Sequence, residues 1–133
     1  VVIVLGSGLG GGIIINGKLF QGSHFQAGEL TFLLPLQMEK LDPSLMQETT
    51  LSAIGLITKV NEILASLDLK DGLLAFKAIN AKKEAVYPIF ETYCRNLAIT
   101  ILNLQTIFDM ETFCSWRWYF SSVYSDRRSQ PPV

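Results

Sequence analysis

The glycine-rich run at residues 6–12 constrains the fold of this chain more than any other feature. It reads GSGLGGG, and apolar β-branched runs flank it at residues 1–5 and 13–15. Continuous runs of this kind are typical of strands buried on both faces, and the glycines predict a turn between them. Asn16-Gly17 then favours a tight hairpin into a strand at residues 18–20. The first twenty residues therefore predict three strands joined by a glycine turn and a hairpin.

Four helical segments are predicted in the remainder of the chain. A capping-box spacing at Ser44 begins the first, and residues 56–67 carry an apolar stripe at helical spacing. Asp71-Gly72 begins a short third helix. The longest helix spans residues 88–108, has a proline in its first turn and repeats apolar side chains every three or four positions. We expect this last helix to pack across the sheet.

Composition places the chain among folded proteins rather than disordered ones. It has 133 residues, of which 49% are hydrophobic and 17% charged, and its mean hydropathy is +0.31. This length suits one compact domain or half of a larger one. The formal net charge is -1 and the pI is about 5.8, which argues against binding of nucleic acid through this segment.

The apolar opening stretch predicts neither a membrane span nor a signal peptide, because glycines and Ser7 interrupt it and no basic leader precedes it. The two cysteines, Cys94 and Cys114, are too few for a disulfide scaffold, so we expect buried thiols in a reducing compartment, the cytoplasm. The chain begins without Met inside a strand-like run. This predicts a C-terminal fragment whose exposed apolar edge favours instability and self-association.

Three features are candidates for chemistry. The glycine run could cradle phosphate oxygens with its backbone amides, Ser7 adding a hydroxyl donor, or could be a structural hairpin only. A dinucleotide fingerprint is excluded because a strand, not a helix, follows the glycines. Glu29 could accept hydrogen bonds from ligand hydroxyls or merely favour a helix dipole. His24, the single histidine, fits a loop imidazole better than a catalytic residue.

Two stretches carry a resemblance to a known family. The run VLGSGLGGGIIINGKLFQGSHFQAGEL resembles the signature of the ROK family of sugar kinases and sugar-responsive repressors, G-T-G-x-G-G-G-I-x-x-N-G-K-L-x-x-G followed by A-G-E-[IL]-G-H. The run RNLAITILNLQTIFDME resembles the last long helix of that family. The resemblance implies an actin-like, ribonuclease H-like α/β fold in two lobes, with residues 1–114 as the C-terminal lobe.

The resemblance also implies site residues. It places five residues at the phosphates of ATP: Gly6, Ser7, Gly8, Gly10 and Gly11. Glu29 is implied to hold sugar hydroxyls, and the similarity of QETTLSAIGL to a family helix implies the same for Glu48. The general base, an Asp, and the D-x-G-G-T phosphate loop are expected upstream of this chain.

The chain departs from the family pattern beside Glu29. Thr31-Phe32 stands where the family has G-H, and the C-x-C-G-x-x-G-C zinc run is absent. The resemblance is therefore to zinc-less members, and we expect ATP and Mg²⁺ as cofactors, without zinc. No catalytic residue or metal ligand is predicted within the chain itself.

The tail at residues 115–133 lacks helical or strand periodicity, which is also typical of a disordered terminus. The family pattern calls here for a strand and a G-G-G-I-S turn at the adenine site. Codons permitted for residues 115–121 spell Val-Gly-Gly-Gly-Ile-Ser when read one base later. We therefore hypothesise that the tail is an out-of-frame translation of this motif, with chance as the alternative.

The sequence favours a cytoplasmic, ATP-dependent sugar (hexose) kinase as the parent protein, acting as a homodimer on ATP and a small sugar. This fragment alone is expected to be inactive. One alternative is the sugar-sensing domain of a ROK-type transcriptional repressor with its DNA-binding helices upstream. Another is a structural subunit without a ligand, for which neither ATP nor any hexose would protect the parent against heat.

Overall fold

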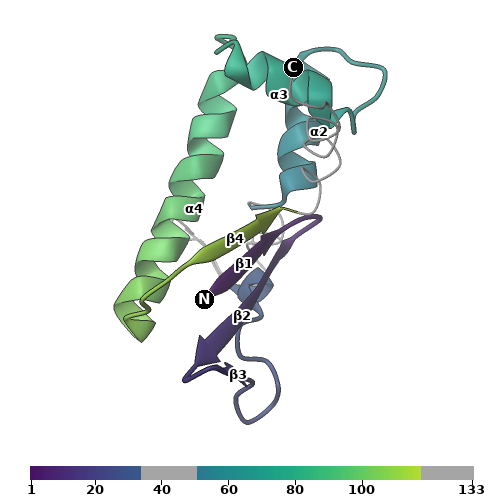
Figure 1. The fold of residues 1–133 in the computed structure, drawn as a ribbon. Coiled ribbons are helices and arrows are strands. Elements are labelled where there is room, and N and C mark those ends of the chain that lie inside the picture. The colour runs from purple at the N-terminus through teal and green to yellow at the C-terminus, as the bar shows by residue number, and fades with distance from the viewer. Residues whose placement is uncertain (34–50, 118–133) are drawn as a thin grey trace, which may run out of the picture.

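A computed structural model describes residues 1–33 and 51–117 of the chain. These residues form a mixed four-stranded sheet in the order β3-β2-β1-β4, with three helices beside it (Figure 1). β1 runs antiparallel to β2, β2 antiparallel to β3, and β4 parallel to β1. The strands are β1 (Val2–Leu5), β2 (Leu9–Ile15), β3 (Lys18–Phe20) and β4 (Cys114–Arg117).

The turn that the glycine run forms is shorter than the sequence predicts. Val4 pairs with Gly10 and Leu5 with Leu9, so only residues 6–8 form the turn and the last three glycines lie within β2. A glycine in a strand carries no side chain to reveal its period, which is why the prediction was wrong at residues 10–12. The hairpin prediction is confirmed, because Asn16 and Gly17 have φ values of 53° and 73°.

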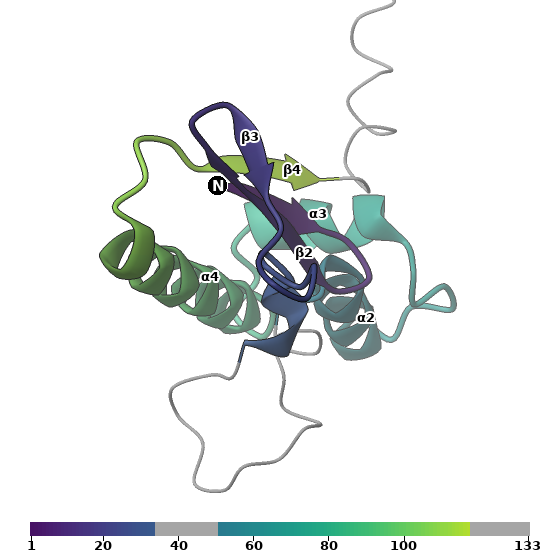
Figure 2. The ribbon, with the colours of Figure 1, turned by 90° about the horizontal axis from the view of Figure 1, so that it is seen from below.

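One face of the sheet is buried, not both as predicted. Ile3 and Leu5 are 1% and 4% exposed, whereas the alternate residues of β1 are only half-buried. Ile14 and Ile15 are 49% and 41% exposed, so the prediction of a fully buried strand was wrong there too. The described helices cover a single face of the sheet, as Figure 2 shows from below, which accounts for the exposure of Ile14. Ile15 shares the face of the buried Ile13 but is the last residue of β2.

The first residues of the helices are set by capping residues rather than by the extent of the predicted apolar stripes. α2 (Ala53–Ile63) begins earlier than predicted because the Ser52 hydroxyl caps it, and it ends before Leu67, which is fully exposed. α3 (Gly72–Asn80) begins after Asp71, whose carboxylate accepts from Leu74 N at 2.9 Å. α4 (Tyr87–Phe108) matches the predicted long helix.

Two apolar clusters hold these elements together. The first joins the inner face of β1 and β2 to η1 (Leu30–Phe32), a 3₁₀ helix, and to the C-terminal half of α4. The second joins α2, α3 and the N-terminal half of α4. Tyr93 packs against both clusters, and its hydroxyl donates to Leu51 O at 3.1 Å. The prediction that the long helix packs across the sheet is therefore confirmed.

Four further expectations from the sequence can be compared with the described residues. Cys94 and Cys114 are exposed, so the prediction of buried thiols was wrong. β4 extends through residues 115–117, where we predicted no strand; pairing with β1 supplies what local periodicity lacks. Ser44 lies outside the described residues.

Among the described helices, none has the length and apolarity needed to cross a membrane.

Candidate functional site

A hollow of about 320 Å³ opens at the carboxyl end of β1, where the glycine turn leads into β2. It brings the turn together with the segment around η1, which lies about twenty residues further along the chain. The lining residues are Val4, Gly6, Ser7, Gly8, Leu9, Gly10, Glu29 and Thr31. Four of the five predicted phosphate-site residues and Glu29, one of the two predicted sugar-binding glutamates, therefore face one space.

The turn presents backbone donors to this hollow. Gly6 N donates to Gly8 O at 3.1 Å and closes the hairpin. The amides of Ser7 and Gly8 donate to no partner among the described residues, and Ser7 is exposed. Nothing lies within 4 Å of the position that a Cβ on Gly6 would take. Two free amides beside open space form the kind of concavity that binds anions.

The N-terminus of α2 fixes the turn from behind. Ala53 N and Ile54 N donate to Gly6 O at 2.9 and 3.3 Å, and Gly55 N donates to the Ser52 hydroxyl at 2.9 Å. These contacts occupy the first amides of the helix, so α2 orients the turn and leaves anion binding to the turn's own amides.

The backbone conformation of the residues on either side of Glu29 fixes its position. Gly28 has φ +91°, a conformation that L side chains rarely adopt, and Leu30 N donates to Gly28 O at 2.8 Å. Glu29 stands at the N-cap position of η1, yet its side chain makes no capping hydrogen bond. It is exposed, and no ion pair to it exists among the described residues. Its carboxylate is free to accept hydrogen bonds from ligand hydroxyls.

Gly11, which the resemblance placed at the phosphates, does not line this hollow. A Cβ there would stand 2.5 Å from Leu30 Cδ1 and 2.8 Å from Gly28 O. Gly11 thus lets the loop before η1 approach β2 closely, and this approach brings Glu29 beside the turn. Its contact with phosphates stays a prediction.

Sequence reasoning missed Thr31 as a lining residue, although its departure from the family pattern was visible. Thr31 is half-buried, and no hydrogen bond of its hydroxyl is found in the described part of the chain. His24 is exposed and does not line the hollow, and Glu48 lies outside the described residues. Within residues 1–33 and 51–117, no group of three or more His, Cys, Asp or Glu side chains could hold a metal ion.

The carboxyl end of β4 lies beside this site. Because β4 runs parallel to β1 with Leu5 opposite Arg117, both strands end at the same edge of the sheet. In sheets with parallel strands, ligands bind at the carboxyl edge. The carboxyl end of β4, at Arg117, therefore lies next to the glycine turn.

The mixed sheet, the glycine turn at its carboxyl edge and the flanking helices belong to the actin-like ATPase fold, shared with solved ROK sugar kinases. The ROK family pattern matches residues 1–114, and the chain belongs to the ROK family.

Relatives of known name agree with this assignment. A β-glucoside kinase from Klebsiella pneumoniae is 29% identical over 114 residues, which cover 84% of this chain and 38% of that protein. A ROK family protein from Streptococcus pneumoniae, solved with sucrose, is 27% identical with a TM-score of 0.76, over 95% of this chain and 43% of that one.

A ROK family glucokinase from Streptomyces griseus, solved with glucose and AMPPNP, shares the fold with a TM-score of 0.70 at 21% identity. That match covers 99% of this chain and 52% of the glucokinase. The chain thus spans about two fifths to one half of the length of these relatives.

Proposed function

We propose that the parent protein is an ATP-dependent sugar kinase and that this chain supplies part of its substrate site. The observation that carries the proposal is the shared hollow, in which the amides of Ser7 and Gly8 lie with the carboxylate of Glu29, none of them with a partner among the described residues. The amides suit an anionic phosphate and the carboxylate suits neutral hydroxyls. A phosphoryl donor and a sugar acceptor are a pair of ligands with these two chemistries.

Each residue of the hollow has a distinct part in this proposal. Gly6, Ser7, Gly8 and Gly10 line the phosphate side, and the absence of side chains on the three glycines lets the phosphate oxygens reach the backbone. Glu29 orients the sugar by accepting from its hydroxyls. Phosphoryl transfer depends mainly on positioning and charge neutralisation, which these groups supply.

The remaining chemistry belongs to groups beyond the described residues. Mg²⁺, when bound with ATP, neutralises the developing negative charge on the phosphates. No described cluster of acidic residues suits it, so we assign its ligands and the Asp base to the rest of the parent protein. Glu48 is proposed as a second residue at the sugar. Zinc has no part in the proposal.

The substrate class we propose is a hexose or a β-glucoside. The support is the β-glucoside kinase relative, which matches most of this chain at 29% identity. The ROK protein solved with sucrose also supports a small saccharide. Thr31 reaches the hollow where the family pattern has glycine, so it narrows the space beside Glu29.

We further propose that residues 115–133 are the out-of-frame product of the family's adenine-site motif. The register supports this, because the first two restored glycines, at residues 116 and 117, would pair with Val4 and Leu5, next to the glycine turn. The DNA encoding this segment tests the idea, since an in-frame tail ending in a genuine stop codon would contradict it.

Nucleotide binding by this chain can be tested through backbone amide chemical shifts during titration with ADP and Mg²⁺. We expect the amides of Ser7 and Gly8 to shift with a weak affinity. The Gly55 amide, already bonded to Ser52, is the internal control and should not move. Equal shifts at all three amides, or none at the turn, would contradict the assignment of phosphates to this hollow.

A further inference from the structure

Thr31 lines the hollow together with Glu29, and the core holds both residues in place. Only Leu30 separates them in the 3₁₀ helix η1. Leu30 is 4% exposed and packs in the cluster that joins β1, β2 and α4. Successive residues of a 3₁₀ helix point in different directions, so a buried Leu30 leaves its two neighbours at the surface of the hollow.

The backbone on both sides of Thr31 is also fixed by hydrogen bonds. Leu30 N donates to Gly28 O at 2.8 Å, and Leu33 N donates to Leu30 O at 3.1 Å. Thr31 itself is half-buried, and its β-branched side chain has a restricted choice of χ1. Its hydroxyl therefore loses little conformational freedom when it binds a ligand.

The hydroxyl of Thr31 differs from those of the threonines on α4. Thr92, Thr100 and Thr106 donate to the carbonyl oxygens of the residues four positions earlier, at 2.9, 3.0 and 2.9 Å. The Thr31 hydroxyl has no such partner within residues 1–33 and 51–117. A half-buried hydroxyl in the wall of a hollow is thus available to a ligand.

Glu29 and Thr31 offer a ligand complementary chemistry. An ionised carboxylate only accepts hydrogen bonds, whereas a threonine hydroxyl also donates. Ser7 is the one other lining residue with a hydroxyl among those described, and it lies in the glycine turn. Every hydroxyl of a sugar can donate to a carboxylate, but the glycosidic oxygen of a substituted sugar has no proton. Beside Glu29 alone, this oxygen would lose its hydrogen bonds with water and gain none.

We propose that Thr31 determines specificity for glycosides by donating a hydrogen bond to the glycosidic oxygen. This role rests on the proposed function, in which Glu29 accepts from a hydroxyl of the same sugar. Thr31 supplies the donor that the carboxylate cannot, so a sugar with a substituted anomeric oxygen has both groups satisfied. Of the two substrate classes proposed above, hexose and β-glucoside, this contact favours the β-glucoside.

The intact parent protein, assayed with ATP and Mg²⁺, tests this role through two acceptors. Methyl β-glucoside carries the glycosidic oxygen, and anhydroglucitol has hydrogen in its place. Thr31→Val keeps the shape of the side chain and removes the donor. We expect it to raise the KM for methyl β-glucoside roughly three- to tenfold and to change the KM for anhydroglucitol by less than about twofold. The kcat should stay the same, because the contact is equally strong before and during transfer.

Two further measurements separate this contact from damage to the fold. Thr31→Ser retains the hydroxyl and should keep the native KM for methyl β-glucoside. In the unaltered protein, methyl β-thioglucoside places sulfur, a weak acceptor, where the glycosidic oxygen was, and its KM should exceed that of methyl β-glucoside by the same roughly three- to tenfold. Thr31→Val should abolish this difference between the two glycosides.

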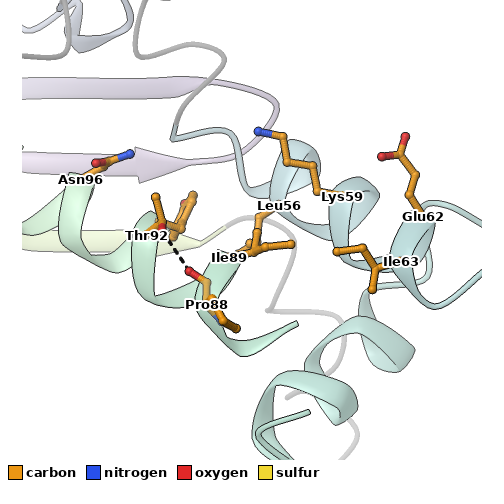
Figure 3. Close-up of a pocket in the computed structure, with 9 residues that line it drawn as sticks. Leu56, Lys59, Glu62, Ile63, Pro88, Ile89, Thr92 and Asn96 are labelled. Atoms are coloured by element: carbon orange, nitrogen blue, oxygen red, sulfur yellow. Dashed lines mark hydrogen bonds between the residues drawn. The ribbon is translucent and has the colours of Figure 1, made fainter. Parts of the chain in front are cut away.

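Thr92→Val is the matched control. It makes the same exchange at an exposed position on α4, where the hydroxyl donates to Pro88 O and lines a separate hollow of about 490 Å³ between α2 and α4 (Figure 3). It should leave the KM for each sugar unchanged. Equal changes for methyl β-glucoside and anhydroglucitol in Thr31→Val, or none, would overturn the role of Thr31 and leave the kinase proposal standing. A parent protein that phosphorylates none of these sugars would contradict the proposed function itself, and the role of Thr31 with it.

Discussion

Gly11→Ala should destabilise the chain because the contact between β2 and the loop before η1 has no room for a methyl group. The added Cβ would stand 2.5 and 2.7 Å from Leu30 Cδ1 and Cγ, and 2.8 Å from Gly28 O. Leu30 is only 4% exposed, and a backbone oxygen cannot rotate away. Overpacking of this kind typically costs about 1–3 kcal/mol, and we expect the upper half of that range.

Gly12→Ala is a matched control on the adjacent residue. A Cβ there meets only Leu19 Cδ1, at an ordinary 3.7 Å. Replacing glycine where its backbone suits alanine stabilises a protein by roughly 0.4–1 kcal/mol through the unfolded state. The two variants should therefore differ by about 2–4 kcal/mol in the free energy of unfolding.

Urea unfolding followed by circular dichroism measures this difference. We expect the midpoint to fall for Gly11→Ala and to stay level or rise slightly for Gly12→Ala. If the first variant is as stable as the second, β2 and the η1 loop do not make the close contact that we describe. In that case the juxtaposition of Glu29 with the glycine turn loses its structural basis.

Three further predictions concern the supports of the site. Ser52→Ala removes the cap of α2 and should cost about 1 kcal/mol, and an unchanged urea midpoint would refute this role of the hydroxyl. Asn61 is fully buried and donates to Leu69 O and Asp71 O at 3.2 and 2.9 Å. Asn61→Ala should therefore cost roughly 2–3 kcal/mol in the same assay, whereas Asn80→Ala, at an exposed position, should be neutral. Cys114 is exposed and should react with a maleimide without denaturant, and protection until unfolding would contradict its placement.

Local signals in the sequence predicted the elements that depend on neighbouring residues. Asn16-Gly17 specifies a turn with positive φ at both positions, and that turn is present. Pro88 and the apolar spacing after it predicted α4 to within one residue of its start. Asp71 capped α3 as its position before glycine suggested. In each case the deciding interaction lies within a few residues of the signal.

What the sequence did not predict depends on contacts between distant segments. The placement of residues 10–12 within β2 is fixed by pairing with β1, and β4 owes its strand conformation to the same neighbour. The exposure of Ile14 follows from the helices covering one face only, whereas Ile15 is exposed at the end of β2. A continuous apolar run cannot show which face of a strand is covered by other elements.

The sequence predicted only part of the candidate site, again because contacts between distant segments decide which residues line it. The glycine turn and Glu29 were recognisable as motifs, and the structure places them in one hollow. Thr31 joins them because a 3₁₀ turn follows Glu29, and its departure from the family pattern was the only sign of it in the sequence. In the sequence, Gly11 cannot be distinguished from the neighbouring glycines. In the structure it lies against Leu30 and Gly28 and does not line the hollow.

Phosphoryl transfer by the intact parent protein tests the central claim most directly. ATP and Mg²⁺ should support phosphorylation of glucose or a β-glucoside. Glu29→Gln should raise the KM for the sugar at least about tenfold, the order expected for one lost charged hydrogen bond, while the KM for ATP changes little. Glu84→Gln, at an exposed position outside the hollow, should leave both unchanged. Sugar binding without transfer would favour the sugar-sensing repressor, and transfer that is indifferent to Glu29→Gln would contradict the site described above.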